Sequence, residues 1–115
     1  MGSYSRKDRL ADHLKKIIDP ILRNNFNPVG LGLMTITNVK MSSDFRLATV
    51  YISFINNEKP IEYLTGELNK KNSFYKFQVS KKWNSKFMPD IEFHYDDTLK
   101  NAEKMTILMR QLSEK

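Results

Sequence analysis

Six lysines lie within residues 69–90, NKKNSFYKFQVSKKWNSKFMPD, and four aromatic side chains are threaded among them. The lysines are Lys70, Lys71, Lys76, Lys81, Lys82 and Lys86, and the aromatic residues are Phe74, Tyr75, Phe77 and Trp83. No acidic residue lies between Glu67 and Asp90. Ammonium groups bind phosphate, and aromatic faces stack on nucleic-acid bases. The pattern therefore favours a nucleic-acid surface, and the alternative is a solvated basic helix face.

The chemistry expected at the centre of this stretch is phosphate binding at a helix start. Ser73 is a plausible N-cap, which leaves the backbone amides of residues 74–76 near a helix N-terminus. Such an end carries roughly half a positive charge and attracts anions. Lys70, Lys71 and Lys76 surround it, and Asn72 can donate a hydrogen bond to a phosphate or sugar. We therefore predict that Ser73 and its four neighbours form the central contact with nucleic acid.

The rest of the basic surface is predicted from three further groups. Lys82 and Lys86 share a helix face at spacing four. Like charges at this spacing destabilise an isolated helix by a few tenths of a kcal/mol. Without a polyanion as partner, the arrangement has no evident benefit. Lys81 is adjacent. Arg6, Lys7 and Arg9 form a second cluster, and Arg46 and Lys40 flank a predicted turn. Ordinary surface charge is the open alternative for these last two groups.

The aromatic side chains are expected to divide between the core and the surface. Tyr75, Trp83 and Phe87 recur at helical spacing, which is typical of a core-facing stripe. Phe74 and Phe77 fall off that stripe. We expect Phe74 to pack, whereas Phe77 is left open between packing and base stacking.

A catalytic or metal site is not expected. The chain has no cysteine, and its two histidines are far apart. His94 stands near Asp96 and Asp97 in the sequence. Strand alternation explains His94 and Asp96 as neighbours on one face of a strand. Asp97 is explained as part of the cap of the last helix. No nucleophile has a base at a recognisable spacing. We therefore predict no enzyme activity, no metal, no cofactor and no small-molecule substrate.

Length and charge favour a single small domain with a polyanionic partner. The 115 residues are 40% hydrophobic and carry a net charge of +6. This size suits one core, so residues 1–115 are interpreted as one domain and the protein as a monomer. A basic excess favours nucleic acid first and an anionic membrane surface second. We see no secretory signal or membrane span, so we expect a cytoplasmic protein.

Periodicity predicts the elements that position these residues. Residues 6–24 form an amphipathic helix with a kink or break near Pro20. Residues 33–41 and 46–54 form an antiparallel hairpin whose second strand alternates, with Ala48, Val50, Ile52 and Phe54 on one face. Helices follow at 60–71 and from Ser73 to Pro89, then a strand at 91–95 and a last helix at 99–112. A three-stranded sheet with helices packed on one face is the economical arrangement.

Three segments carry a resemblance to a known family. They are LGLMTITNVKMSSDFRLATVYISF (31–54), LNKKNSF (68–74) and MPDIEFHYDDTL (88–99). In this order and spacing the chain resembles ribosome-binding factor A. The last segment holds the family's proline, acidic residue and apolar strand at Pro89, Asp90, Ile91 and Phe93, followed by Asp96, Asp97 and Thr98. Two places depart from the family pattern: Lys71, Asn72 and Ser73 replace its usual Ala-x-Gly, and the loop at Asn27 and Pro28 is one residue longer at Gly30.

The resemblance implies an α+β fold of the KH-like type II, α-β-β-α-α-β, plus a C-terminal helix. It also implies a non-enzymatic assembly factor that binds the immature small ribosomal subunit and its rRNA, and assists late rRNA maturation, especially in the cold. Two alternatives stay open. One is a general single-stranded RNA-binding KH module, against which the glycine-free helix break argues, because clamping KH domains use a GxxG loop. The other is a protein-interaction or membrane-surface module that uses the basic first helix.

Overall fold

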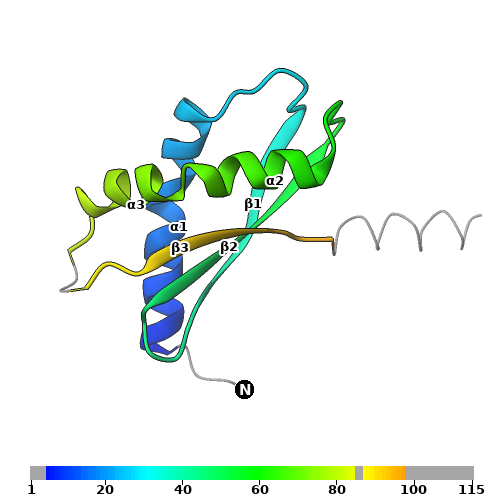
Figure 1. Ribbon diagram of the computed structural model, residues 1–115. Coiled ribbons are helices and arrows are strands. Elements are labelled where there is room, and N and C mark those ends of the chain that lie inside the picture. The colour runs from blue at the N-terminus through cyan, green and yellow to red at the C-terminus, as the bar shows by residue number, and fades with distance from the viewer. Residues whose placement is uncertain (1–4, 85–86, 98–115) are drawn as a thin grey trace, which may run out of the picture.

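The computed structural model describes residues 5–84 and 87–97 of the chain (Figure 1). Their elements are α1 (Arg6–Asn25), β1 (Leu33–Met41), β2 (Leu47–Ile55), α2 (Ile61–Lys70), α3 (Asn72–Ser80) and β3 (Asp90–Tyr95). This order confirms the predicted KH-like α-β-β-α-α-β arrangement. The predicted helix at 99–112 lies outside the described residues, as does Lys86.

Helix α1 begins at a capping box and runs through its proline. The Ser5 hydroxyl accepts from the Asp8 amide, and the Asp8 carboxylate accepts from the Ser5 amide, so two orphan donors of the first turn are paired. Pro20 lies inside the 20-residue helix, so of the predicted kink or break, the break does not occur. Ile17, Ile18 and Leu22 are buried on either side of Pro20, and their packing holds the helix together where a backbone hydrogen bond is lost.

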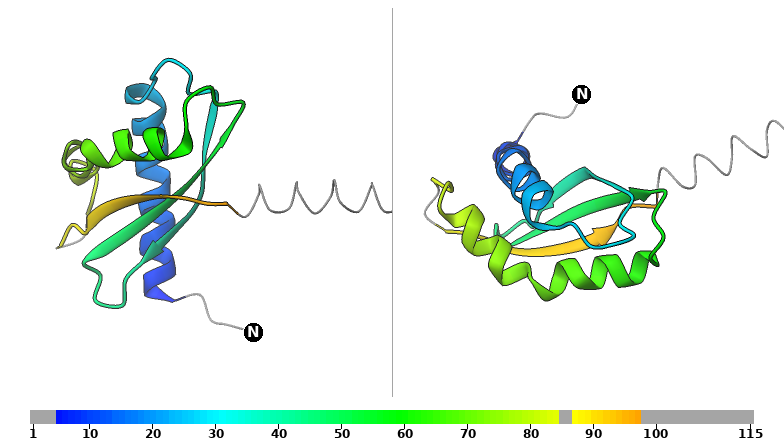
Figure 2. Two further views of the ribbon diagram at one scale, coloured as in Figure 1. Left: turned by 45° about the vertical axis from the view of Figure 1, so that its right-hand side comes forward. Right: turned by 90° about the horizontal axis from the view of Figure 1, so that it is seen from above.

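The sheet has the order β1-β2-β3, with an antiparallel β1–β2 pair and a parallel β2–β3 pair. The predicted hairpin is therefore confirmed. The inward positions of β2, namely Ala48, Val50, Ile52 and Phe54, are all buried, and Ile91 and Phe93 continue this face on β3. The other face carries half-buried or exposed side chains, such as Thr49, Tyr51 and His94, apart from Ser53, which is buried. Among the described residues, helices therefore cover one face of the sheet, and α1 crosses that face (Figure 2).

Helices α2 and α3 run beside β3 and complete the core with Leu64, Leu68, Tyr75 and Val79. The prediction that the second of them continues to Pro89 is wrong, because α3 ends at Ser80. The Lys82 and Trp83 amides bond to carbonyls three residues back, which tightens the last turn and lets the chain leave toward β3. Trp83 still reaches the core, but Phe87 is 73% exposed, so its predicted place in the core is wrong.

Candidate nucleic-acid interface

The break between α2 and α3 consists of a single residue, Lys71. Its amide donates to the Leu68 carbonyl, and its own carbonyl accepts from the Tyr75 amide. Lys71 therefore occupies the N-cap position of α3, and no side chain caps this end. The prediction that Ser73 is the N-cap is wrong, because the chain turns within one residue and Ser73 already lies in the first turn of the helix.

This short break changes which amides face outward. The Tyr75 amide, which was predicted to be available, is used by the Lys71 carbonyl at 3.1 Å. An α-helix leaves the first amides of its first turn without intrahelical partners. In α3 these belong to residues 72–74, so the anion-attracting end lies about two residues earlier than predicted.

Two of the three lysines around the break are paired with carboxylates. Lys70 Nζ lies 3.0 Å from Glu67 Oε1, and this hydrogen bond raises the pKa of Lys70. Lys76 Nζ lies 2.6 Å from Asp90 Oδ1. Lys71 is exposed and has no ion pair among the described residues. Exposed pairs of this kind contribute roughly 0–1 kcal/mol, so each lysine can exchange its carboxylate for a phosphate at little cost.

Acidic groups also line the hollow at the start of α3. This hollow, of about 300 Å³, is bounded by Asn72, Ser73 and Lys76, but also by Asp90 and Glu92. The Asn72 side chain donates to the Ile91 carbonyl at 3.3 Å, which ties α3 to β3. The surroundings of the helix start are therefore of mixed charge, and not the uniformly basic ring that the sequence suggested.

Further along α3 the basic and aromatic side chains meet on the surface. Lys81 Nζ lies 4.9 Å from the centre of the Phe77 ring, and Phe77 is 60% exposed. Lys82 is exposed as well. Phe74, which was expected to pack, is 41% exposed and touches Tyr75 edge-on, with the ring centres 5.4 Å apart. These rings are accessible, as stacking on a base requires.

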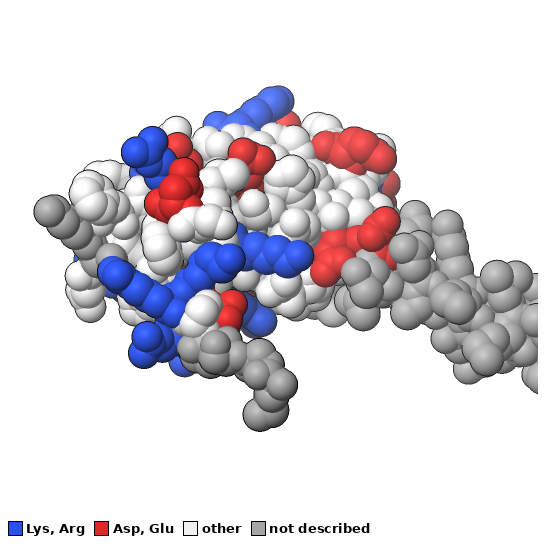
Figure 3. All heavy atoms as spheres, turned by 90° about the horizontal axis from the view of Figure 1, so that it is seen from below, with Lys and Arg blue, Asp and Glu red and all other residues white. Residues whose placement is uncertain are grey.

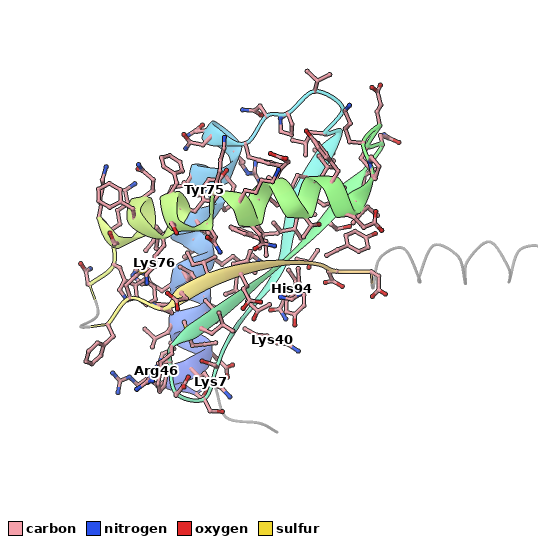
Figure 4. All side chains as sticks on the ribbon, in the orientation of Figure 1. Lys7, Lys40, Arg46, Tyr75, Lys76 and His94 are labelled. Atoms are coloured by element: carbon pink, nitrogen blue, oxygen red, sulfur yellow. The ribbon has the colours of Figure 1, made fainter. Side chains whose placement is uncertain are left out.

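The structure brings together three predicted residues that are far apart in sequence. Arg6 from the start of α1, Arg46 from the β1–β2 loop and Lys76 from α3 all line one cleft, of about 690 Å³. We call it the hairpin cleft. Figure 4 shows Arg46 and Lys7 at the same end of the molecule. Seen from that end, Lys and Arg side chains adjoin one another in a band over part of the surface, with Asp and Glu side chains beside it and at its end (Figure 3).

The cleft also contains aromatic residues that the sequence reasoning did not assign to a site. Phe45, Trp83 and Phe87 line it together with Met88. The Arg6 guanidinium carbon lies 5.6 Å from the centre of the Phe45 ring. The sequence offered one signal for Phe45: it is a large apolar residue within a short polar turn, SSDFR. Such a side chain has no apolar neighbour in the turn, so it packs against residues from other parts of the chain.

The hydrogen bonds within the β1–β2 loop occupy the Asp44 carboxylate and leave the Arg46 guanidinium available for an external anion. The Asp44 carboxylate accepts from the Ser42 hydroxyl at 2.7 Å and from the Arg46 amide at 3.1 Å. These hydrogen bonds, the Ser42 contact first, lower the pKa of Asp44. The carboxylate is thus directed into its own loop, and the guanidinium groups of Arg6 and Arg46 have no ion pair among the described residues.

The described ranges contain neither a candidate metal site nor a membrane-spanning helix. No group of three or more His, Cys, Asp or Glu side chains that could hold a metal ion occurs among residues 5–84 and 87–97. His94 Nε2 lies 2.8 Å from Glu92 Oε1 on the open face of the sheet. None of the helices described in these ranges has the length and apolar character to cross a membrane.

Comparison with known proteins identifies relatives along nearly the whole chain. Residues 6–109 match the family model for ribosome-binding factor A. The chain is similar to ribosome-binding factor A of Staphylococcus carnosus (27% identity, covering 98% of both chains) and of Alkaliphilus metalliredigens (29% identity, covering 98% of this chain and 83% of the relative).

Solved structures with the same fold bear related names. A Thermotoga maritima protein described as a putative ribosome binding factor A superposes with a TM-score of 0.70 at 25% identity, covering 82% of this chain and 90% of that one. The crystal structure of ribosome-binding factor A from Thermus thermophilus superposes with a TM-score of 0.68 at 20% identity, covering 79% and 97%. A homology model of the Thermus thermophilus factor, fitted into a map of its complex with the 30S subunit, gives 0.62 at 17% identity, covering 75% and 90%.

Proposed function

This chain belongs to the ribosome-binding factor A family, and we propose that it is an assembly factor that binds the immature small ribosomal subunit through its rRNA. Its further role is to assist late rRNA maturation, including growth in the cold. The partner class is suggested by the Thermus thermophilus factor, which was fitted into a complex with the 30S subunit. The single observation that carries the RNA contact is the convergence of Arg6, Arg46 and Lys76 from three elements on one cleft.

The proposed interface contains two basic areas of different character. The first area comprises Arg6 and Arg46, which line the hairpin cleft, and Lys7 and Arg9, which follow Arg6 in the first turn of α1. All four are exposed and have no ion pair among the described residues. Around the α2–α3 break, the predicted set is Lys70, Lys71, Asn72, Ser73 and Lys76, continued along the chain by Lys81, Lys82 and Lys86. We infer that the first area makes the initial electrostatic contact. Its cations can bind phosphate directly, whereas Lys70 and Lys76 must first release a carboxylate.

The proposal assigns the protein a binding role, with no chemical step performed on RNA. Lys and Arg contacts to phosphate fix position and orientation but read no base sequence. The specificity for an unfinished small subunit then comes from the shape of the rRNA at the site. A protein of this kind acts where ribosomes are assembled, in the cytoplasm, and as a monomer.

Cosedimentation with purified immature small subunits at several salt concentrations tests the binding proposal. If about five phosphates are contacted, log affinity falls with log salt with a slope of roughly 3.5 to 4.5. A Lys70→Glu, Lys71→Glu, Lys76→Glu variant tests the break together with Lys76, which also lines the cleft, and an Arg6→Glu, Arg46→Glu variant tests the cleft alone. Both are expected to bind more weakly and with a smaller slope.

The matched control changes three lysines outside the predicted set, Lys15→Glu, Lys16→Glu and Lys59→Glu. This variant alters the net charge as much as the first one does, so it separates a local contact from overall attraction. Equal weakening by the control and the test variants, or a wild-type slope near zero, contradicts the proposed interface.

The maturation role needs a separate test in cells. Removal of the gene is expected to raise the share of unprocessed small-subunit rRNA, most strongly at low temperature, and the wild-type gene is expected to restore processing. The Arg6→Glu, Arg46→Glu gene should restore it poorly if binding through the cleft is required. Normal rRNA processing without the gene in the cold contradicts this role.

A further inference from the structure

The hairpin cleft joins an apolar wall to a basic rim. Leu10 of α1 and Met41 of β1 line it with the aromatic residues, and Arg6, Arg46 and Lys76 stand around it. Its volume of about 690 Å³ falls within the range of about 300–1,000 Å³ that is usual for small-ligand sites. Asp44 and Asp90 also line the cleft, so its rim carries three cations and two carboxylates. An apolar hollow with a net positive rim suits a ligand that has both a flat apolar part and a negative charge.

Phe45 is held in the cleft by a backbone conformation that is unusual for its type. Its φ is 62°, in the left-handed region that bulky residues rarely adopt. The turn around it enforces this conformation, because the Phe45 amide donates to the Ser42 carbonyl at 3.0 Å and the Ser42 amide donates to the Leu47 carbonyl at 2.8 Å. A strained residue persists where the surroundings fix it, and such residues cluster at functional sites.

Phe87 presents a second ring at the same cleft. Its side chain is 73% exposed, while its backbone carbonyl accepts from Trp83 Nε1 at 2.9 Å. Trp83 itself is only 9% exposed, so this hydrogen bond ties the segment of Phe87 to the core. Burying an exposed phenylalanine side chain is favourable, so a bound apolar group that covers the ring gains stability from the contact.

The charges around the cleft select among possible occupants. Lys76 is paired with Asp90, and Asp44 is directed into its own loop, whereas Arg6 and Arg46 have no ion pair among the described residues. An apolar protein side chain would cover the rings but leave both guanidinium groups without an anion. Inorganic phosphate would meet the guanidinium groups but leave the Phe87 ring exposed, whereas Phe45 is already half-buried. A nucleotide satisfies both, because its base stacks on rings and its phosphate pairs with arginine.

We propose that the hairpin cleft takes one unpaired nucleotide of the rRNA, with its base against Phe45 and Phe87 and its phosphate at Arg6 and Arg46. This inference rests on the proposed function and deepens it, because it adds a base-dependent contact to an interface otherwise made of phosphates. Base stacking tolerates any sequence, so the cleft distinguishes unpaired from paired RNA without reading base identity.

The protein carries its own probe for this test, because Trp83 is its single tryptophan and lines the cleft. Tryptophan fluorescence is followed while the full chain is titrated with an adenosine pentanucleotide. The comparison ligand is an abasic pentamer with the same phosphates and no bases. The pentanucleotide is expected to change the Trp83 emission and to bind roughly 5- to 100-fold more tightly than the abasic pentamer, as one stacked base implies.

Two variants locate the effect. Phe87→Ala is expected to remove most of the preference for the pentanucleotide while leaving affinity for the abasic pentamer unchanged. Tyr63→Ala is the matched control, because Tyr63 is also an exposed ring, 48% accessible, with a lysine 5.9 Å above it, but it lies on α2 outside the cleft. This control should keep the full preference. Thermal unfolding of each variant verifies that it is folded.

The outcomes separate the cleft from the general function. Equal binding of both pentamers by the wild type, or an unchanged preference in Phe87→Ala, overturns the nucleotide proposal even if the protein cosediments with small subunits. Loss of cosedimentation in Phe87→Ala combined with equal binding of both pentamers would assign the cleft to a ribosomal protein and also overturn it. Failure of the wild type to cosediment while the base preference holds would instead contradict the proposed function alone.

Discussion

The side chain of Asn69 pairs with both backbone groups of Phe93. Asn69 Nδ2 donates to the Phe93 carbonyl at 2.8 Å, and the Phe93 amide donates to Asn69 Oδ1 at 2.8 Å. In the part of the chain that the structure describes, β3 lies at the edge of the sheet and its outer backbone groups have no neighbouring strand. One carboxamide therefore takes the place of a missing strand at this position, and it fixes α2 against β3.

We expect Asn69→Ala to lower the free energy of unfolding by about 2–4 kcal/mol, because it leaves a part-buried donor and a part-buried acceptor unpaired. Urea unfolding followed by circular dichroism measures this. The control is Asn25→Ala, which removes an exposed hydrogen bond to the Ile21 carbonyl and is expected to cost less than about 1 kcal/mol. Similar losses in the two variants would show that the Asn69 contact is not special.

Two glycine-to-alanine changes are expected to have opposite signs. At Gly32, with φ of 70°, a Cβ would clash with the Ile55 carbonyl oxygen, so Gly32→Ala should destabilise by at least about 1–2 kcal/mol. Gly66 lies in the interior of α2 with nothing within 4 Å of an added Cβ, and Gly66→Ala should stabilise by about 0.5–1 kcal/mol. Thermal unfolding of both variants gives the signs, and a stabilising Gly32→Ala would refute the close approach at that turn.

The buried hydroxyl of Tyr75 is a source of instability. Its ring is fully buried, and the oxygen has no hydrogen-bond partner among the described residues. We expect Tyr75→Phe to raise the free energy of unfolding by about 1 kcal/mol. An unfolding free energy lower than that of the wild type would mean that the hydroxyl is satisfied.

The same residue predicts a loss of stability in alkali. Burial raises the pKa of Tyr75 above its ordinary value of 10.0. The folded state then retains the phenol proton where the unfolded state releases it, so stability is full below pH 10 and falls as pH rises through the folded-state pKa. Unfolding of wild type and Tyr75→Phe is compared from neutral pH to pH above 10, and the fall should be smaller in the variant. Parallel curves would contradict the assignment.

The Lys76–Asp90 pair is expected to restrain RNA binding. Asp90→Asn removes a negative charge from the lining of the hairpin cleft and frees Lys76 for phosphate. We expect the affinity for immature small subunits to rise roughly two- to fivefold, with a salt slope larger by about 0.7–0.9. Asp19→Asn frees Arg23 on α1 in the same way, away from the cleft, and should change neither. No gain in Asp90→Asn would place Lys76 outside the contact.

Local pattern was sufficient for the order and type of the described elements and for most of the faces they bury. Alternation placed Ala48, Val50, Ile52 and Phe54 on the inner face, and the structure buries all four. A side chain's face depends on residues within about four positions of it, which periodicity can read. The sequence also revealed the basic stretch after Glu67, because the number of lysines and the absence of acidic residues up to Asp90 can be read directly from it. It extended α3 too far, because apolar spacing continues past Ser80 although the backbone must turn toward β3.

Only the tertiary structure decided what the charged groups meet. Asp90 faces Lys76 because β3 pairs in parallel with β2 and lies beside α3, which brings together residues 14 positions apart. Arg6 and Arg46 share a cleft because α1 crosses the sheet at the end where the hairpin turns. These contacts depend on the strand register and on the angle at which the helix crosses the sheet. Many residues far apart in the sequence determine both, so local pattern does not predict them. The sequence by itself determined that this protein is basic and KH-like, and the packing determined where its positive charge is free to bind.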